Sequence, residues 1–471
     1  MVFSSLAFLF IFLPVTLAAY HLVPTRYRNV VLLVSSLVFY AWGGPRYLPL
    51  LAGEALVSWA LALLIQTART EREKSLLLAL ECVVLLGLLA FFKYTGFILA
   101  NVQALTGGEG DVFSPVLPIG ISFYTFQLIS YVADVRRGTV AAQPRYWKLL
   151  LYCSCFHQCI AGPIVRYETV ANEIDHRSAT ANDVYLGVRR FCCGLAKKAV
   201  LANSCANVAD ALIPVGALGP QSVSGYWLGM VFYTLQIYLD FSAYSDMAIG
   251  LGRMVGFHYL ENFDHPYQAH SVQDFWRRWH ISLSSFFRDY VYIPLGGSRC
   301  STPAYVRNMA VVWLLTGLWH GASWNYVLWG AYYLAFLLFE KFVVRGRMPR
   351  VLGHPFTLLV VMVGWVLFRF ENFGELGQVL AGMVGIGAKG LTSLSVRTTL
   401  LQNAYLLVLS IVACTGLGTW LHRTIGMKAR SNEAIFTAYS IGEMVLPAVL
   451  LLVSVVALAG ASYNPFIYFQ F

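Results

Sequence analysis

Long apolar stretches separated by short polar segments dominate the pattern along the chain. An apolar run of about 20 residues can cross a bilayer as a helix. Such runs predict spanning or re-entrant helices at 6–23, 29–44, 47–66, 75–100, 115–134, 147–165, 184–213, 224–256, 304–342, 354–370, 398–421 and 437–461. The polar segments between them are too short to fold alone, so we expect a single integral-membrane domain over residues 1–471.

The composition agrees with this pattern. Of the 471 residues, 58% are apolar and 12% are charged, whereas a soluble domain carries roughly 25% charged residues. A soluble enzyme is therefore excluded, and we predict an all-α polytopic membrane protein with roughly 10–12 transmembrane and re-entrant helices. The nine cysteines form no CxxC pair, which predicts buried free thiols instead of a disulfide framework.

Basic residues alternate between the loops. The segment 67–74 contains Arg69, Arg72 and Lys74, whereas the segment 101–113 contains no Lys or Arg. The positive-inside rule places 67–74 inside and the N-terminus outside, in the periplasm of a Gram-negative cell. The first apolar run has no basic residue before it, which predicts a membrane helix instead of a cleaved signal. The net charge of +10 suits contact with anionic lipid, and no motif indicates nucleic-acid binding.

A single histidine lies within the apolar segment 313–329. Gly317 and Gly321 are four residues apart, so on a helix they share a face and allow another backbone to approach closely. Held there, a neutral His320 could take a proton from a hydroxyl group as a general base. The alternative is a histidine that only bonds to a neighbouring helix. Ionisable groups inside a membrane are costly and are therefore candidates for function.

The segment 275–290 is too charged to span, and its arginines and aromatic residues suit a helix in the interface or a re-entrant one. On one helix Trp276 and His280 would be i,i+4 neighbours. His280 precedes His320 by 40 residues, so both histidines could line one cavity. The alternative is an ordinary amphipathic helix at the interface.

The segment 233–253 places carboxylates within an apolar helix. Such groups should face a polar cavity or an arginine. We favour structural ion pairs with the arginines of 275–290 over direct acid–base chemistry. The residues expected to be structural or to line the cavity are Asp240, Asp246, Tyr244, Gln236, Trp319 and Asn325.

Two other signals are weak. The segment 385–390 matches GxGxxG but follows no strand, so we interpret it as a loop. His258, His265 and His270 lie near Asp264, but their spacing matches no known metal motif. We expect no metal site.

The longer motifs resemble a known family. They are MVFSS at the start, LPIGISFYTFQLISYVADVRRG (117–138), IAGPIVRY (160–167), YTLQIYLDFSAYSDMAIGLGRMVGF (233–257), ENFDHPY (261–267), FWRRWHISLSSFFRDYVYIPLGG (275–297), LTGLWHGASW (315–324) and GWVLFRFENF (364–373). With these runs the chain resembles the membrane-bound O-acyltransferases, and within them the branch that acetylates bacterial exopolysaccharides.

The resemblance implies a ring of helices around an aqueous tunnel. The catalytic histidine of the family matches His320, and a second family histidine matches His280. We expect Arg277, Arg278 and Arg288 to bind the phosphates of the donor if they do not pair with aspartates. The expected donor is cytoplasmic acetyl-CoA, with no tightly bound cofactor.

The implied activity passes an acetyl group across the inner membrane for O-acetylation of an exopolysaccharide such as alginate. The expected partners are a periplasmic polysaccharide O-acetyltransferase, the exopolysaccharide synthesis complex and the lipid bilayer. Three alternatives remain: acetylation of cellulose, D-alanyl transfer to teichoic acid, and a transporter or flippase without covalent chemistry.

Overall fold

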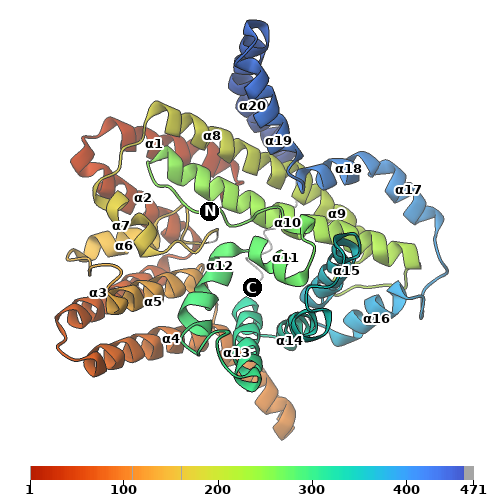
Figure 1. The fold of residues 1–471 in the computed structure, drawn as a ribbon, viewed down its shortest axis with the longest axis horizontal. Helices are drawn as coiled ribbons and strands as arrows, with labels where there is room; N and C mark the ends of the chain where they lie inside the picture. The colour runs from red at the N-terminus through yellow and green to blue at the C-terminus, as the bar shows by residue number, and fades with distance from the viewer. Residues whose placement is uncertain (1, 109, 161, 461–471) are drawn as a thin grey trace. The chain divides into compact units, whose positions relative to one another are not determined.

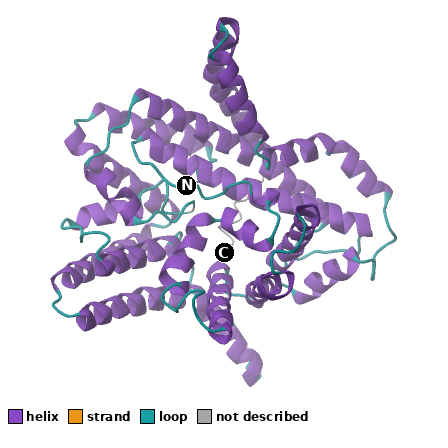
Figure 2. Cartoon of the chain, viewed as in Figure 1, coloured by secondary structure: helices purple, strands orange, loops and turns teal. Residues whose placement is uncertain are grey.

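The computed structural model describes residues 2–108, 110–160 and 162–460. Within these residues the regular structure is entirely helical, and Figure 2 shows helices joined by loops with no strand among them. The prediction of an all-α protein is therefore confirmed. The chain divides into two compact units, of which the first contains Met1–Phe191 and Met247–Glu261 and the second contains Cys192–Asp246 and Asn262–Phe471.

The helices of the first unit come mainly from the N-terminal part of the chain, coloured red to yellow in Figure 1. They are η1 (Phe8–Phe12), α1 (Leu13–Leu22), η2 (Thr25–Tyr27), α2 (Arg28–Gly43), η3 (Pro45–Tyr47), α3 (Leu48–Thr67), α4 (Glu71–Thr106), α5 (Ile121–Arg137), α6 (Tyr146–Ser154), α7 (Tyr167–Asp175) and the first part of α8 (Ala181–Ala196), with the last turns of α10 (Val223–Met254).

The second unit contains parts of α8 and α10, which both units share, and most of the C-terminal half of the chain. Besides the end of α8 and most of α10, its helices are η4 (Lys197–Ala202), α9 (Asn203–Leu212), η5 (Pro266–Gln268), α11 (Val272–Arg278), α12 (Ile281–Phe287), η6 (Arg288–Tyr292), α13 (Thr302–His320), α14 (Trp324–Phe339), η7 (Glu340–Val344), α15 (Arg350–Arg369), α16 (Phe373–Met383), α17 (Leu394–Gln402), α18 (Ala404–Ala413), α19 (Leu417–Ala429) and α20 (Glu433–Ala459).

Local sequence explains where the longest helix, α4, begins and ends. The Thr70 hydroxyl accepts a hydrogen bond from Glu73 N at 3.1 Å, and the Glu73 carboxylate accepts one from Thr70 N at 3.2 Å. This capping box satisfies two backbone donors at the helix start. Gly107 ends the helix with φ +69°, a conformation that glycine adopts without steric cost.

Fewer helices qualify as membrane spans than the apolar runs predict. By length and composition, five helices in the described residues can cross a membrane, or six if the pair α17 and α18, bent by 57°, is one span. The run 147–165 supplies only the nine-residue α6, and 304–342 is broken between α13 and α14. The helix α5 has 17 residues and is buried along most of its length. An apolar run indicates that a segment is buried. The sequence does not distinguish burial against other helices from burial in lipid.

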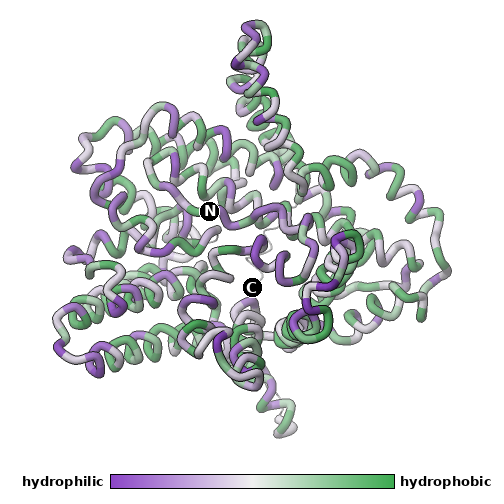
Figure 3. Tube along the Cα trace, in the orientation of Figure 1, coloured by the Kyte–Doolittle hydropathy of each residue, from purple (hydrophilic) through white to green (hydrophobic). Residues whose placement is uncertain are grey.

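Hydropathy separates the helices of the second unit. Figure 3 draws α18 mostly green, for hydrophobic residues, and α11 largely purple, for hydrophilic ones. The short and polar α11 nevertheless buries Phe275 and Trp276, which are 0% and 9% exposed. The prediction that 275–290 does not span agrees with two short helices, α11 and α12, although their aromatic residues pack inside the unit.

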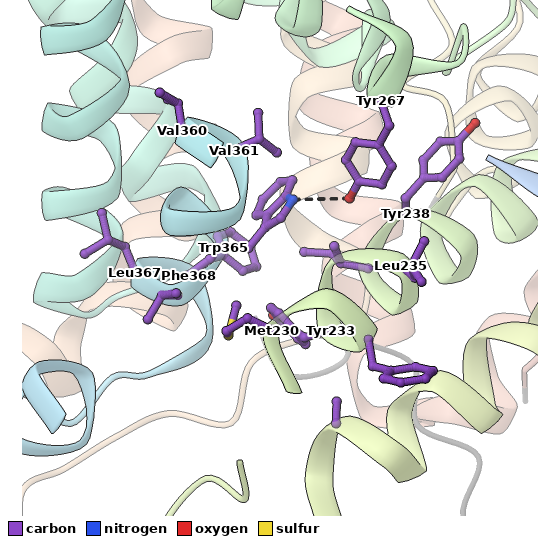
Figure 4. Close-up of a cluster of buried hydrophobic side chains, with 14 of the residues drawn as sticks. Met230, Tyr233, Leu235, Tyr238, Tyr267, Val360, Val361, Trp365, Leu367 and Phe368 are labelled. Carbon is purple, nitrogen blue, oxygen red and sulfur yellow. Dashed lines mark hydrogen bonds between the residues drawn. The ribbon is translucent and has the colours of Figure 1, made fainter. Parts of the chain in front are cut away.

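An aromatic core supports these short helices. Figure 4 shows side chains of α10 and α15 packed around Trp365, whose indole N–H donates to the Tyr267 hydroxyl at 3.2 Å. The Tyr267 hydroxyl in turn donates to Thr234 O at 2.5 Å. Buried aromatic residues with polar tips need such partners. These bonds therefore connect the segment before α11 to two long helices.

Candidate active site

His320 is the last residue of α13 and is 4% exposed. Three aromatic rings surround its imidazole: Trp319 at 5.0 Å, Trp329 at 5.0 Å and Phe368 at 5.2 Å between ring centroids. The sequence predicted a position in the middle of one helix, and this was wrong. Residues 321–323 are extended or bent, so the chain is broken directly after His320. Broken helices at membrane depth are tolerated where they border a cavity.

Close packing of α13 on α14 holds this break in place. A Cβ atom added to Gly317 would lie 2.3 Å from Tyr326 O, and one added to Gly330 would lie 2.4 Å from Trp313 O. The predicted close approach of another backbone at Gly317 is therefore confirmed. Gly321 also packs against Tyr326, but it lies beyond the helix end and shares no helix face with Gly317. Without side chains at these positions the two helices can touch.

His280 joins α11 to α12 in an unusual backbone conformation. Its φ is +46° and its ψ is +55°, a left-handed conformation that a residue with a Cβ adopts at a steric cost. Because α11 ends at Arg278, Trp276 and His280 do not share a helix, and the predicted i,i+4 relation is wrong. The left-handed residue reverses the chain direction and places the imidazole inside the unit, 1% exposed.

Asn262 holds the His280 ring. The Asn262 Oδ1 atom accepts hydrogen bonds from Ser282 N at 3.1 Å and Ser282 Oγ at 2.9 Å, and it lies 3.3 Å from His280 Nδ1. An oxygen that accepts from a backbone N–H is an acceptor toward the ring as well, so Nδ1 carries the proton and Nε2 carries the lone pair. Burial lowers the pKa of His280 to about 3, so the ring is neutral at physiological pH.

Both histidines line one cavity of about 410 Å³ in the second unit. Trp276 and Trp313 form part of its wall, with ring centroids 4.9 Å apart. The hydroxyl groups of Ser284, Ser285 and Thr316 also line it. The prediction that His280 and His320 could share a cavity is therefore confirmed. The arrangement offers two imidazoles and several hydroxyl groups to a small molecule between aromatic and aliphatic side chains.

The three arginines of this segment have different positions. Arg277 and Arg288 line the cavity, whereas Arg278 does not. Arg278 bonds to Asp274 at 2.9 Å and to Asp264 at 3.5 Å, and Arg288 bonds to the neighbouring Asp289 at 2.6 Å. Within the described residues Arg277 has no ion-pair partner. Its guanidinium is exposed and remains available to an anion.

The expected pairs between these arginines and the helix α10 do not form. Asp240 pairs with Lys198 at 2.7 Å, and both side chains are almost fully buried, at 2% and 3% exposed. Asp246 pairs with Lys197 at 2.5 Å. The prediction that an arginine of 275–290 serves as the partner is wrong, because η4 brings two lysines to α10. These lysines were the missed signal, since charges within the apolar run 184–213 require a partner.

The other residues expected around the cavity are buried but do not line it. Gln236, Tyr244, Trp319 and Asn325 are each no more than 5% exposed, and none of them borders the cavity of 410 Å³. Neither Asp240 nor Asp246 borders it. Asn325 instead donates to Leu367 O at 3.1 Å and connects α14 to α15. Asn262, which the sequence-based prediction did not include, is closer to the chemistry because it orients His280.

Within the described residues, no group of three or more His, Cys, Asp or Glu side chains is placed to hold a metal ion. His258 instead pairs with Glu173 at 2.7 Å, and His265 lies 3.2 Å from Asp264.

Comparison with known proteins identifies the family. The model of the membrane-bound O-acyltransferase family matches residues 140–358, a range that includes both histidines. A protein of Azotobacter vinelandii named "Probable alginate O-acetylase AlgI" is 40% identical over the full length of both chains. The chain belongs to the membrane-bound O-acyltransferase family. It is therefore an O-acyltransferase and a multi-pass membrane protein.

Other proteins similar to this chain differ in the acceptor that their names give. The peptidoglycan O-acetyltransferase of Helicobacter pylori is 33% identical over 84% of this chain and 82% of the relative. The teichoic acid D-alanyltransferase of Bacillus subtilis is 26% identical over 54% of this chain and 69% of the relative. The names of these similar proteins thus give more than one acyl group and more than one acceptor.

Proposed function

We propose that this O-acyltransferase takes an acetyl group from cytoplasmic acetyl-CoA and passes it across the inner membrane for O-acetylation of an exopolysaccharide such as alginate. The observation that carries the proposal is the single cavity shared by His280 and His320. The identity to alginate O-acetylases over the whole chain supports the choice of acetyl group and acceptor. A periplasmic O-acetyltransferase and the exopolysaccharide synthesis complex are the proposed partners, and the N-terminus is proposed to be periplasmic.

The chemistry uses the histidines as neutral bases. The acceptor hydroxyl gives its proton to His320 while its oxygen attacks the thioester carbonyl carbon. The new C–O bond forms, the C–S bond breaks, and the imidazolium returns the proton to the departing thiolate. His280, oriented by Asn262, accepts a hydrogen bond from the reacting hydroxyl through Nε2. Arg277, at the edge of the same cavity, attracts the phosphates of the donor.

The direct test is the acetyl content of the secreted polysaccharide. A strain that lacks the gene is complemented with wild-type protein or with His320→Ala, and membrane levels of both proteins are measured. We expect acetylation with the wild type only. Acetylation without the gene contradicts the proposal. An unchanged acetyl content together with loss of D-alanyl groups from another polymer assigns the alternative substrate, and changed transport without any ester assigns a transporter.

Access to the cavity is tested with cysteine labelling. Ser323 follows His320 at the break in the chain, and Ser301 lies in an exposed loop. In a background without native cysteines, we expect small water-soluble thiol reagents to label Ser323→Cys measurably but more slowly than Ser301→Cys. Acetyl-CoA on the cytoplasmic side should protect Ser323→Cys alone. A Ser323→Cys variant that is inert from both sides excludes a water-filled path.

A further inference from the structure

The first unit contains a second cavity with a different chemical character. It has a volume of about 620 Å³, and residues at the end of α3, the start of α4 and the end of α5 line it. The lining includes the basic side chains of Lys74, Arg136 and Arg137 and one acidic side chain, that of Glu71. Apolar side chains complete the wall, among them Ile65 and Val135, so the lining combines cationic and apolar side chains.

The positive charge of this cavity is not cancelled by its own acid. Glu71 bonds to Lys74 at 2.8 Å, but the Glu71 side chain is 75% exposed, so water screens this pair. Arg137 lies 3.9 Å from the buried Asp134, a loose ion pair. The Arg136 Nη2 atom donates to Ser75 Oγ at 2.8 Å.

One N–H group of the Arg136 guanidinium is buried. The Nε atom of Arg136 has no hydrogen-bond partner in the described part of the chain. A buried N–H of a charged group without a partner costs free energy. The guanidinium of Arg136 therefore has hydrogen-bonding capacity that the described residues do not use.

The local fold builds this cavity. Gly138 caps α5 with φ +75° and turns the chain sharply. The following segment is tied back to α3, because Ala142 N donates to the Gln66 side-chain oxygen at 2.6 Å. The basic residues at the end of α5 also face the negative end of the helix dipole. The dipole alone accounts for Arg136 and Arg137, but it does not account for Lys74, which lies in the first turn of α4.

The cavity lies at the level where two membrane spans end. The span Pro45–Thr67 stops beside it, and the span Glu71–Thr106 starts beside it. Leu64 and Leu76 on these spans are 52% and 61% exposed, and exposed leucines on a spanning helix face acyl chains. Lys74 and the half-buried Leu78 are four residues apart, so they lie on one face of α4 about 6 Å apart along the helix axis. Acyl chains and the cationic side chains of the cavity are therefore within the reach of one lipid molecule.

We propose that this cavity binds the phosphate of an anionic phospholipid headgroup. The phosphate oxygens would accept hydrogen bonds from Arg136 and Lys74 while the glycerol region contacts the apolar side chains of the lining. Basic pockets at the ends of transmembrane helices bind anionic headgroups through this combination of charge and apolar contact. The site does not depend on acyl transfer, since its residues belong to the first unit and none of them lines the histidine cavity.

The test counts lipid molecules bound to the purified full-length protein by native mass spectrometry. The protein in a zwitterionic detergent is titrated with phosphatidylglycerol or with phosphatidylcholine. We expect Lys74→Gln/Arg136→Gln to bind phosphatidylglycerol about tenfold more weakly than the wild type. The matched control is Arg69→Gln/Arg72→Gln, which removes two charges near the start of α4 at residues that do not line the cavity, and it should stay within about twofold of the wild type.

Further arms separate folding and the source of the phosphate. Thermal unfolding in the same detergent shows whether each variant is folded, and Arg136→Lys should keep most of the binding. An equal loss of phosphatidylglycerol binding in both double variants overturns the proposal, because the overall surface charge then explains the binding. Another outcome is that phosphatidylglycerol and phosphatidylcholine bind equally well while inorganic phosphate binds in the cavity. In that case the site takes a soluble phosphate and the assignment to lipid is wrong.

Discussion

The histidine cavity of the second unit and a carboxyl cluster in the first unit are both polar regions buried among apolar helices. In the cluster, Glu54 and Glu81 are 2% and 0% exposed, which matches the burial of the two histidines. The Ser58 hydroxyl lies 2.5 Å from Glu81 Oε1, and Thr125 donates to Glu54 Oε2 at 3.1 Å. Neither carboxyl group lines either of the two cavities.

The difference between the two regions is access. His280 and His320 border a space that a substrate can occupy, whereas the two glutamates are buried and line neither of the two cavities described above. An ionisable group in an apolar segment is a candidate for function because its burial is costly. The comparison adds a second condition for a functional group, which is that its side chain must also line a cavity. Substitutions in the two regions should therefore have very different effects on acyl transfer.

The largest effect is expected at His320. Replacing it with alanine removes the general base and should lower acyl transfer by about 10²–10⁴-fold. The measurement is the rate of acetyl transfer per molecule of protein in membranes, with thermal unfolding as the control for folding. A well-folded His320→Ala variant with wild-type activity assigns the histidine a structural role.

His280 should show a large but smaller loss. Because its φ is +46°, alanine at this position combines a steric cost with loss of the imidazole. Asparagine tolerates the left-handed conformation better, so His280→Asn separates the two effects. We expect His280→Asn to be more stable than His280→Ala and equally low in activity. Recovery of activity in His280→Asn means that only the backbone conformation matters.

The buried pair of Lys198 and Asp240 tests a polar contact that meets neither cavity. Lys198→Met leaves an uncompensated charge on Asp240 and should destabilise the protein by about 3–5 kcal/mol. The double variant Lys198→Met/Asp240→Leu should recover most of that loss, because no buried charge remains. The yield of folded protein and its unfolding temperature are measured. A double variant as unstable as the single one shows that the pair is needed for more than neutralisation.

Adjacent arginines provide a matched test of donor binding. Arg277 lines the cavity, and Arg278 bonds to Asp274 and Asp264 outside it. We expect Arg277→Gln to raise the KM for acetyl-CoA about tenfold with a smaller change in kcat, which corresponds to one charged hydrogen bond. Arg278→Gln should leave this KM unchanged and lower stability slightly. Equal KM values in both variants remove Arg277 from the donor site.

The smallest effect is expected for the carboxyl cluster. Glu54→Gln and Glu81→Gln keep the shape and the hydrogen-bonding oxygen of each side chain while they remove the ionisable group. Acyl transfer should stay within about twofold of the wild type in both variants. A loss as large as that of His320→Ala brings the glutamates into the reaction and breaks the distinction between the two regions.

The residue types and motifs of the sequence were sufficient for several conclusions. Apolar composition and the scarcity of charge determined an all-α membrane protein. The position of His320 in an apolar segment and its separation of 40 residues from His280 identified two histidines that line one cavity. The motifs around them identified the family. These properties are local: each depends on a short run of residues whose solvent preference or order can be read without knowledge of contacts.

Only the tertiary structure decided which polar groups meet. The partners of Asp240 and Asp246 are two lysines more than forty residues earlier in the chain, and the pattern of α10 alone does not distinguish lysines from arginines. The number of membrane spans also required the structure, because an apolar helix such as α5 can bury its hydrophobic side chains against other helices as well as in lipid. The break after His320 depends on the packing of Gly317 against Tyr326. Contacts between distant segments set ion pairs, helix breaks and cavities, and a periodicity along the chain records none of them.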